Sequence, residues 1–234
     1  MNLIILAVAP AIALVFFIYS FDKYEKEPIS LLFKVFSFGA LSVIPIVFVE
    51  DMLMSFNIFS GLFSAFYISF IVAGFTEEFF KRLIVMKIAF NARHYSEKLD
   101  GIVYSAIASL GFAAVENIMY VAVSFKDDIS VGITRAFLSV PAHMLFGITM
   151  GYYLSLSKYA KSEKEMKKYY NKSLIVPMVL HGTFNFILLS NHPLLILIFI
   201  PYLIYLWTVN IKRLRFYQRE SKLELEKENL IDEF

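Results

Sequence analysis

The chain has 234 residues, of which 59% are hydrophobic and 18% are charged. This composition is too apolar for a soluble globular domain and is typical of an integral membrane protein, so the expected surrounding is a lipid bilayer, and no nucleic-acid partner is expected. The sequence contains no cysteine, which excludes disulfides, thiolate zinc sites and cysteine nucleophiles.

Apolar segments long enough to cross a bilayer, about 20 residues each, recur along the chain. Seven are expected, at 3–21, 29–50, 65–90, 99–123, 131–155, 173–190 and 194–211. The first segment lacks a basic region and a small-residue cleavage site, which favours a retained span over a signal peptide. The sequence therefore predicts an all-α fold, a polytopic integral membrane helix bundle in the cell membrane.

The distribution of Lys and Arg predicts the orientation of the spans, because positive charge collects on the cytoplasmic side. Basic residues gather in the 156–172 loop, after the third span, and at the start of the tail. The turns at 124–130 and 191–193 have few, so we expect them outside, with the N-terminus outside and the C-terminus cytoplasmic. No repeat or linker divides the chain, so we expect one transmembrane domain over 1–211 and a charged cytoplasmic tail, helical or frayed, over 212–234.

The third span carries four ionisable side chains in the sequence FTEEFFKRL, residues 75–83. Each charged residue at mid-bilayer costs about 2.5–3.5 kcal/mol, so these charges must be compensated. One interpretation is structural, since Glu77 with Lys81 and Glu78 with Arg82 form i,i+4 pairs. A span over 65–90 places the glutamates about halfway through the membrane, which favours a functional role.

Three later spans bring ionisable groups to a similar depth. At about 1.5 Å per residue, Glu77 and His143 lie roughly 18 Å, His181 roughly 14 Å and Glu116 roughly 11 Å below the outer ends of their helices. A single buried histidine is more simply a core residue. The coincidence in depth of all four groups predicts one functional layer in the outer half of the membrane.

These side chains suit the hydrolysis of an amide bond. A carboxylate among aromatic residues, with a cation beside it, can accept a proton from water and return it. His181 and Asn185 lie one helical turn apart and can hold a carbonyl oxygen as it becomes an oxyanion. Close helix approach around the cavity is predicted at four small residues, Gly111, Gly147, Gly151 and Gly182.

The same residues resemble the PrsW family of intramembrane proteases. EEFFK at 77–81 matches its EExxK motif, FAAVEN at 112–117 matches FxxxEN, and an isolated His143 is followed by HGTFN at 181–185. The loop DKYEKEP at 22–28 is also similar to that family. The resemblance covers about residues 20–210. The PrsW family belongs to a wider group that also contains the CAAX prenyl endopeptidases and the bacteriocin-processing proteins.

The resemblance implies an intramembrane endopeptidase that makes the site-1 cut in a single-span membrane protein such as an anti-sigma factor, within a stress response. It implies that Glu77 or Glu78 activates water, with Lys81 as the cationic neighbour. Arg82 and Asn117 are further supporting residues of the two motifs.

The resemblance also assigns the later motif residues. His181 and Asn185 match the motif proposed to stabilise the oxyanion. Glu116 stands where the CAAX enzymes have a histidine, so the role of that histidine does not carry over, and His143 is the candidate to replace it.

The sequence leaves the metal and the function class open. No HExxH motif is present and we favour a metal-free reaction, but zinc held by Glu77, His143 and His181 is an alternative. A relay through the intramembrane acids and histidines also fits a proton- or ion-coupled transporter, although no inverted repeat is visible. A non-catalytic membrane scaffold is the third interpretation. We expect Arg135 to extend towards the outer surface.

Overall fold

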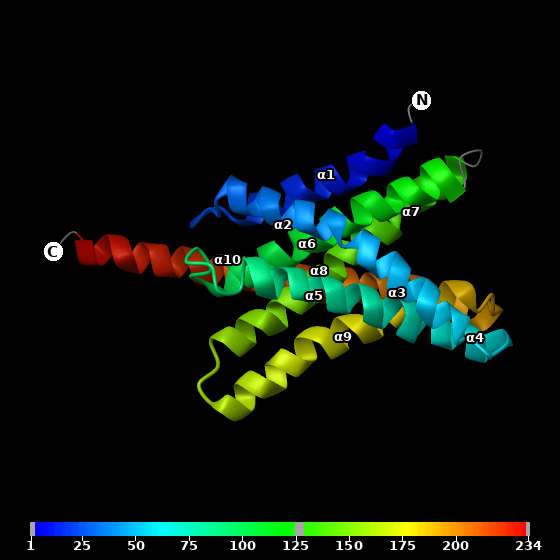
Figure 1. The fold of residues 1–234 in the computed structure, drawn as a ribbon. Coiled ribbons are helices and arrows are strands. Elements are labelled where there is room, and N and C mark those ends of the chain that lie inside the picture. The colour runs from blue at the N-terminus through cyan, green and yellow to red at the C-terminus, as the bar shows by residue number, and fades with distance from the viewer. Residues whose placement is uncertain (1–2, 125–128, 233–234) are drawn as a thin grey trace.

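A computed structural model describes residues 3–124 and 129–232, and all regular secondary structure within these ranges is helical (Figure 1). The helices are α1 (Leu3–Phe21), α2 (Ile29–Leu41), α3 (Val43–Ser55), α4 (Gly61–Tyr67), α5 (Thr76–Ile88), α6 (Lys98–Ile118), α7 (Ile129–Phe137), α8 (Ser139–Lys158), α9 (Glu163–Leu189) and α10 (Pro193–Asp232). Two π-helical stretches join them, η1 (Ile68–Phe75) between α4 and α5, and η2 (Met119–Ser124) after α6. The predicted outer turn at 124–130 lies largely outside the described residues.

Within the described residues, six helical segments are long and apolar enough to cross a membrane, and a shorter apolar helix over Ala7–Phe21 corresponds to the first predicted span. The six are Ile29–Ser55, Gly61–Ile88, Lys98–Val121, Gly132–Lys158, Glu163–Leu189 and Pro193–Lys227. The prediction of an all-α polytopic bundle is therefore confirmed.

The lysine-rich loop predicted at 156–172 is wrong, because α9 begins at Glu163 and leaves a short connection after α8. The side chain of Ser162 caps this helix by accepting a hydrogen bond from the backbone N–H of Glu165, at 3.3 Å. Acidic residues in the first turn of α9 also stabilise this end of the helix, because the helix dipole places a partial positive charge there. Lysine is a good helix former, so the basic segment continues the helix beyond its apolar part. The tail is likewise helical, through Asp232.

The two ends of the bundle differ in charge as the predicted topology requires. Figure 1 shows the segments 22–28, 89–97 and 159–162 at the same end as the C-terminal part of α10, and the segments 56–60 and 190–192 at the opposite end. The basic segments predicted to be cytoplasmic therefore share one end of the molecule. The side of the membrane on which this end lies stays a prediction.

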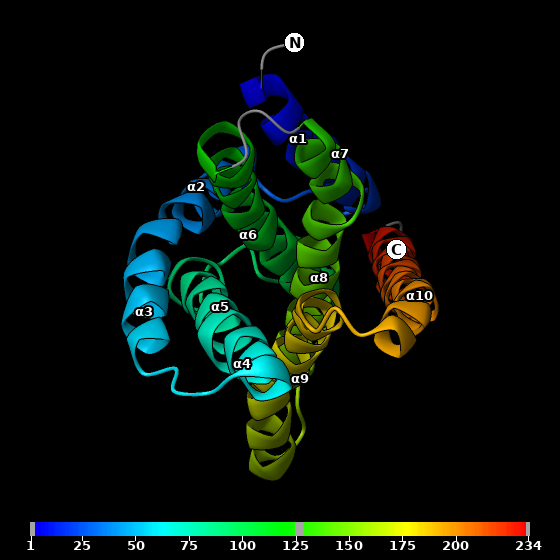
Figure 2. The ribbon, with the colours of Figure 1, turned by 90° about the vertical axis from the view of Figure 1, so that its right-hand side faces the viewer.

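Helix α6 lies at the centre of the bundle, beside α8 and α2 (Figure 2). Every residue from Leu99 to Ala114 is buried. A Cβ atom added at Gly151 would lie 2.0 Å from the carbonyl oxygen of Gly101, and one at Gly111 would lie 2.1 Å from that of Phe36. The predicted close approach at these glycines is confirmed, and it fixes the spacing of the helices that carry the site residues.

Candidate active site

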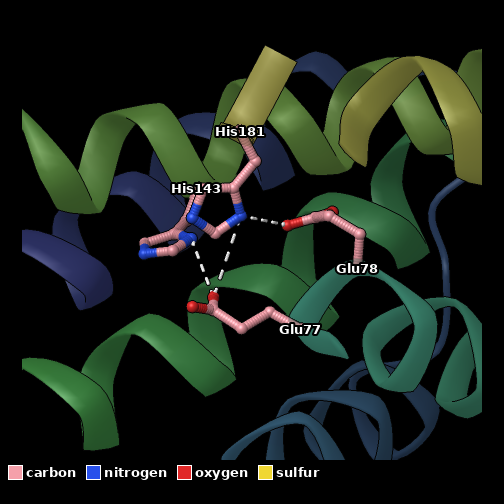
Figure 3. Close-up of side chains that lie close together, drawn as sticks. All are labelled: Glu77, Glu78, His143 and His181. Atoms are coloured by element: carbon pink, nitrogen blue, oxygen red, sulfur yellow. Dashed lines mark hydrogen bonds and ion pairs between the residues drawn. The ribbon is translucent and has the colours of Figure 1, made fainter. Parts of the chain in front are cut away.

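The ionisable side chains predicted to share one layer meet between four helices. Figure 3 shows Glu77 and Glu78 of α5 directed towards His143 of α8 and His181 of α9. The Nδ1 atom of His181 lies 3.0 Å from Oε1 of Glu78 and 3.9 Å from Oε2 of Glu77. All four side chains are buried. Residues far apart in the sequence thus form one polar cluster within apolar surroundings.

Lys81 lies at the centre of this cluster. Its Nζ atom is 3.0 Å from Oε2 of Glu77 and 2.8 Å from Oε1 of Glu78. The same nitrogen is 3.1 Å from Nδ1 of His143 and 4.1 Å from the ring centre of Phe112. The residue is 0% exposed. Two carboxylates and a cation–π contact therefore compensate the charge of a fully buried ammonium group.

The predicted pair between Glu78 and Arg82 is wrong. Arg82 donates from Nη2 to the backbone oxygen of Tyr170, at 3.0 Å, and its guanidinium lies 3.9 Å from the ring centre of that tyrosine. This contact ties α5 to α9 instead. The predicted i,i+4 pair between Glu77 and Lys81 is present, at 3.0 Å, and Glu78 shares the same lysine, at 2.8 Å.

Glu116 of α6 extends the cluster on the far side of His143. Its Oε2 atom lies 2.9 Å from Nε2 of His143 and 2.7 Å from Nη2 of Arg135. Arg135 also donates from Nε to Oδ1 of Asn117, at 2.9 Å. The expectation that Arg135 extends to the outer surface is wrong, because the half-buried carboxylate of Glu116 replaces water as its partner. Asn117 in turn donates to the backbone oxygen of Ala7, at 2.8 Å, which joins α6 to α1.

The hydrogen bonds define which ring nitrogens are available. His143 accepts from Lys81 at Nδ1, so Nε2 carries the proton and donates to Glu116. Both of its nitrogens are occupied. His181 uses Nδ1 towards Glu78. Its Nε2 atom makes no hydrogen bond with the residues that the structure describes, and the ring borders a cavity.

A cavity of about 530 Å³ adjoins the cluster. Its lining includes Glu77, His181 and Asn185 but not Glu78, which is fully buried. Met54 and Leu189 also line it, each near the end of its helix at the predicted outer end of the bundle. The cavity therefore distinguishes the two adjacent glutamates, since it gives Glu77 alone access to water or a substrate.

Three charged residues of the cavity lining, Glu50, Asp51 and Arg135, were not predicted as part of the site. Glu50 and Asp51 interrupt the apolar sequence VFVEDMLM, residues 47–54. Ionisable residues within a membrane span are presumed functional, and this rule could have identified Glu50 and Asp51 from the sequence. No local pattern in the sequence pairs Arg135 with Glu116, because the two belong to different helices.

The π-helical stretch η1 directly precedes Glu77 and Glu78 and packs against α9. A Cβ atom added at Gly74 would lie 2.7 Å from the backbone oxygen of Ser69, 3.1 Å from that of Met178 and 3.2 Å from the nitrogen of Gly182. Glycine thus permits the backbone contact that brings His181 beside Glu78. π-Helical segments frequently occur at functional sites, because they change the direction of the side chains that follow.

The cluster contains donors that could hold a metal ion. One ligand atom each from Glu77, Glu78, His143 and His181 lies within 4.8 Å of the others, and zinc accepts this type of donor set. However, three of these residues already bind the ammonium group of Lys81. At an effective dielectric constant near 20, each pair of like unit charges 4 Å apart repels by about 4 kcal/mol. The donor set does not fit a divalent ion while Lys81 keeps this position.

Comparisons with known proteins agree on one family. The family described as PrsW family intramembrane metalloprotease matches residues 27–209. The protease PrsW of Clostridioides difficile is 40% identical over 223 residues, covering 95% of this chain and 94% of that protein. The protease PrsW of Bacillus subtilis is 36% identical over 208 residues, covering 88% and 91%. The protease PrsW of Oceanobacillus iheyensis is 38% identical over 209 residues, covering 89% and 92%. No solved structure matches the chain.

Proposed function

The chain belongs to the PrsW family of intramembrane proteases, and from this premise we propose that it cleaves membrane-anchored proteins with water activated by Glu77. The observation that carries the proposal is the position of this carboxylate. Glu77 borders the cavity and is hydrogen-bonded at Oε2 to a buried cation, whereas the neighbouring Glu78 has no access to the cavity.

Glu77 acts as the general base. Water in the cavity gives a proton to Glu77 as its oxygen attacks the carbonyl carbon of the scissile bond. The same carboxyl group returns the proton to the amide nitrogen as the C–N bond breaks, which leaves a new carboxylic acid and a new amine. Lys81 compensates the charge of this carboxylate in the resting enzyme, so the base is maintained in apolar surroundings.

His181 and Asn185 stabilise the oxyanion of the tetrahedral intermediate. Both line the cavity, and the side chain of Asn185 makes no hydrogen bond with the described residues, so its amide is available to a substrate. Glu78 accepts a hydrogen bond at 3.0 Å from Nδ1 of His181 and so fixes the orientation of this ring at the wall of the cavity.

His143 and Glu116 position this machinery. Both ring nitrogens of His143 have protein partners, so we assign it to holding the Lys81 ammonium and not to binding water. Glu116 holds the ring from the other side and is itself held by Arg135. This division of roles differs from the expectation that His143 takes over the role of the histidine found in the CAAX enzymes.

No step of the proposed reaction uses a metal ion. The family description names metalloproteases, and a metal in this donor set would supply a Lewis acid for the carbonyl group and an activated water. The ammonium group among the same donors supports chemistry that uses the side chains alone. Purified protein stripped with a chelator should therefore stay active. Recovery from near-zero activity when zinc is added back would contradict this part of the proposal.

The proposed substrate is a protein with a single membrane span that presents its outer juxtamembrane segment to the cavity. The lining residues near the predicted outer ends of α3 and α9 support entry from that side. The family resemblance suggests a membrane-anchored anti-sigma factor as the substrate, cleaved at its first site.

Replacement of Glu77 by Gln tests the proposal. The substitution keeps the shape of the side chain but removes the base, so cleavage of a co-expressed tagged substrate should fall by at least about 100-fold. The exposed Glu224 offers a matched control, and Glu224→Gln should cleave as the parent protein does. Membrane-protein fragments in cells carrying each variant are compared. Parental turnover by Glu77→Gln would remove Glu77 from the mechanism.

A further inference from the structure

Lys81 occupies an unusual position for a lysine side chain. Its ammonium group is fully buried and lies within 3.1 Å of atoms of Glu77, Glu78 and His143. These are three of the four residues whose donor atoms together could hold a metal ion. One further acceptor is present, because Oε2 of Glu78 is buried without a hydrogen-bond partner among the described residues.

We propose that the Lys81 ammonium is the resident cation of this site and takes the place of a divalent metal ion. The chain would then hold a latent zinc site that becomes available only when Lys81 is removed. This inference deepens the proposed function, since it explains how the site keeps two carboxylates together without a metal.

The distances make the two cations mutually exclusive. A zinc ion lies about 2.0–2.2 Å from a carboxylate oxygen. The oxygens of Glu77 and Glu78 lie 3.0 Å and 2.8 Å from Nζ of Lys81. An ion bound to either oxygen would therefore lie within about 5 Å of the ammonium group, in a mostly buried region where solvent screens charges only weakly.

The balance of charge at the site also indicates that Lys81 and a metal ion exclude each other. Glu77 and Glu78 bring two negative charges, and Lys81 neutralises one of them while His181 donates a hydrogen bond to Glu78. Removal of the lysine leaves two carboxylates and two imidazoles around an uncompensated centre. A divalent cation supplies the charge that this centre then lacks.

The test measures metal binding to the full-length protein, purified in detergent and stripped with a chelator. The parent protein, Lys81→Ala and Lys87→Ala are dialysed against zinc and analysed for bound metal. Lys87 lies exposed on the same helix and provides the matched control. We expect about one equivalent of zinc in Lys81→Ala and essentially none in the other two proteins. Cobalt in place of zinc should give an absorption spectrum of a nitrogen- and oxygen-ligated ion in Lys81→Ala alone.

A second variant keeps the test informative if Lys81→Ala does not fold. Lys81→Met keeps the length of the side chain without its charge, and zinc should raise its thermal midpoint if the metal binds the folded state. Adding His143→Ala to either variant should abolish binding.

Stoichiometric zinc in the parent protein, lost when Glu77 or His143 is replaced, would overturn the proposal. Folded Lys81 variants that bind no zinc would overturn it as well. These experiments measure metal binding and thermal stability, not peptidase activity. A result against the Lys81 proposal can therefore be distinguished from a result against the proposed function, which is tested by cleavage in Glu77→Gln.

Discussion

Glu77 and Glu78 show how two adjacent residues of the same type acquire different roles. Glu77 borders the cavity, whereas Glu78 is fully buried between Lys81 and His181. The first can meet water, and the second can only hold its neighbours. A helix that turns by about 100° per residue gives this result when one of the two positions faces a cavity and the other faces a packed helix.

This difference predicts that replacement of Glu78 mainly affects stability. Glu78→Gln removes half of the negative charge around the Lys81 ammonium and should lower the free energy of unfolding by about 3 kcal/mol. Thermal unfolding in detergent measures the effect. Glu77→Gln should lower the midpoint less, because water from the cavity reaches this position. Equal midpoints for Glu78→Gln and the parent protein would contradict the buried ion pair.

Acidic residues outside the spans give the protein a pH-dependent stability. Burial raises the pKa of Glu27 to about 7 and that of Glu97 to about 8, both from 4.5. Tyr104 donates a hydrogen bond to Glu27, and the backbone N–H of Glu27 donates to Asp22 at 2.7 Å. The first bond fastens the 22–28 segment, between α1 and α2, to α6, and the second lies within this segment.

The direction of this pH dependence follows from the raised pKa values. Each carboxyl binds its proton more tightly in the folded chain than in the unfolded chain. Its contribution to stability is therefore complete below about pH 4.5 and is lost as the pH rises towards about 8. The thermal midpoint of the parent protein should fall across this range, and Glu27→Gln should reduce the slope. An unchanged slope would exclude Glu27 as a contributor.

At the scale of elements, the contact between η1 and α9 sets the distance between the carboxylates and His181. The atoms nearest to a Cβ at Gly74 belong to the backbone, whereas those nearest to a Cβ at Gly182 belong to the ring of Phe70, at 2.3 Å. A side-chain ring can rotate away, but two packed backbones must separate.

Gly74→Ala should therefore impair the protein more than Gly182→Ala. We expect Gly74→Ala to lower the free energy of unfolding by about 1–3 kcal/mol and to reduce cleavage further than the stability loss explains, since His181 moves away from Glu78. Cleavage assays and thermal unfolding of both variants make the comparison. A larger loss in Gly182→Ala would contradict this account of the helix contact.

At the scale of the whole molecule, charge separates the two ends of the bundle. The basic N-terminal part of α9 and the C-terminal part of α10 lie at one end, and the segment 190–192 lies at the other (Figure 1). Because the chain contains no cysteine, single introduced cysteines report topology without background.

His192→Cys and Lys161→Cys test the predicted orientation, since both positions are exposed and belong to the segments 190–192 and 159–162, which lie at opposite ends of the bundle (Figure 1). A membrane-impermeant thiol reagent should label His192→Cys in intact cells and Lys161→Cys only after the membrane is permeabilised. The reverse pattern would place the cavity opening on the cytoplasmic side.

The sequence by itself determined the class of the protein, the number and rough position of its apolar helices, and the acids and histidines that lie within them. These are local properties, because the free energy of inserting a segment sums over contiguous residues and a charge inside a segment is costly whatever lies beside it. The polarity of the lysine-rich 156–172 segment wrongly predicts a loop, because the α9 cap at Ser162 starts a helix there.

Only the tertiary structure decided which charges meet. The contact of Lys81 with His143, the pairing of Arg135 with Glu116, and the access of Glu77 but not Glu78 to the cavity all depend on how helices are rotated and how closely they pack. Contacts at glycines from separate helices set those rotations and distances. The spacing of residues in the sequence determines which of them share one face of a helix. It does not specify which neighbouring helix packs against that face.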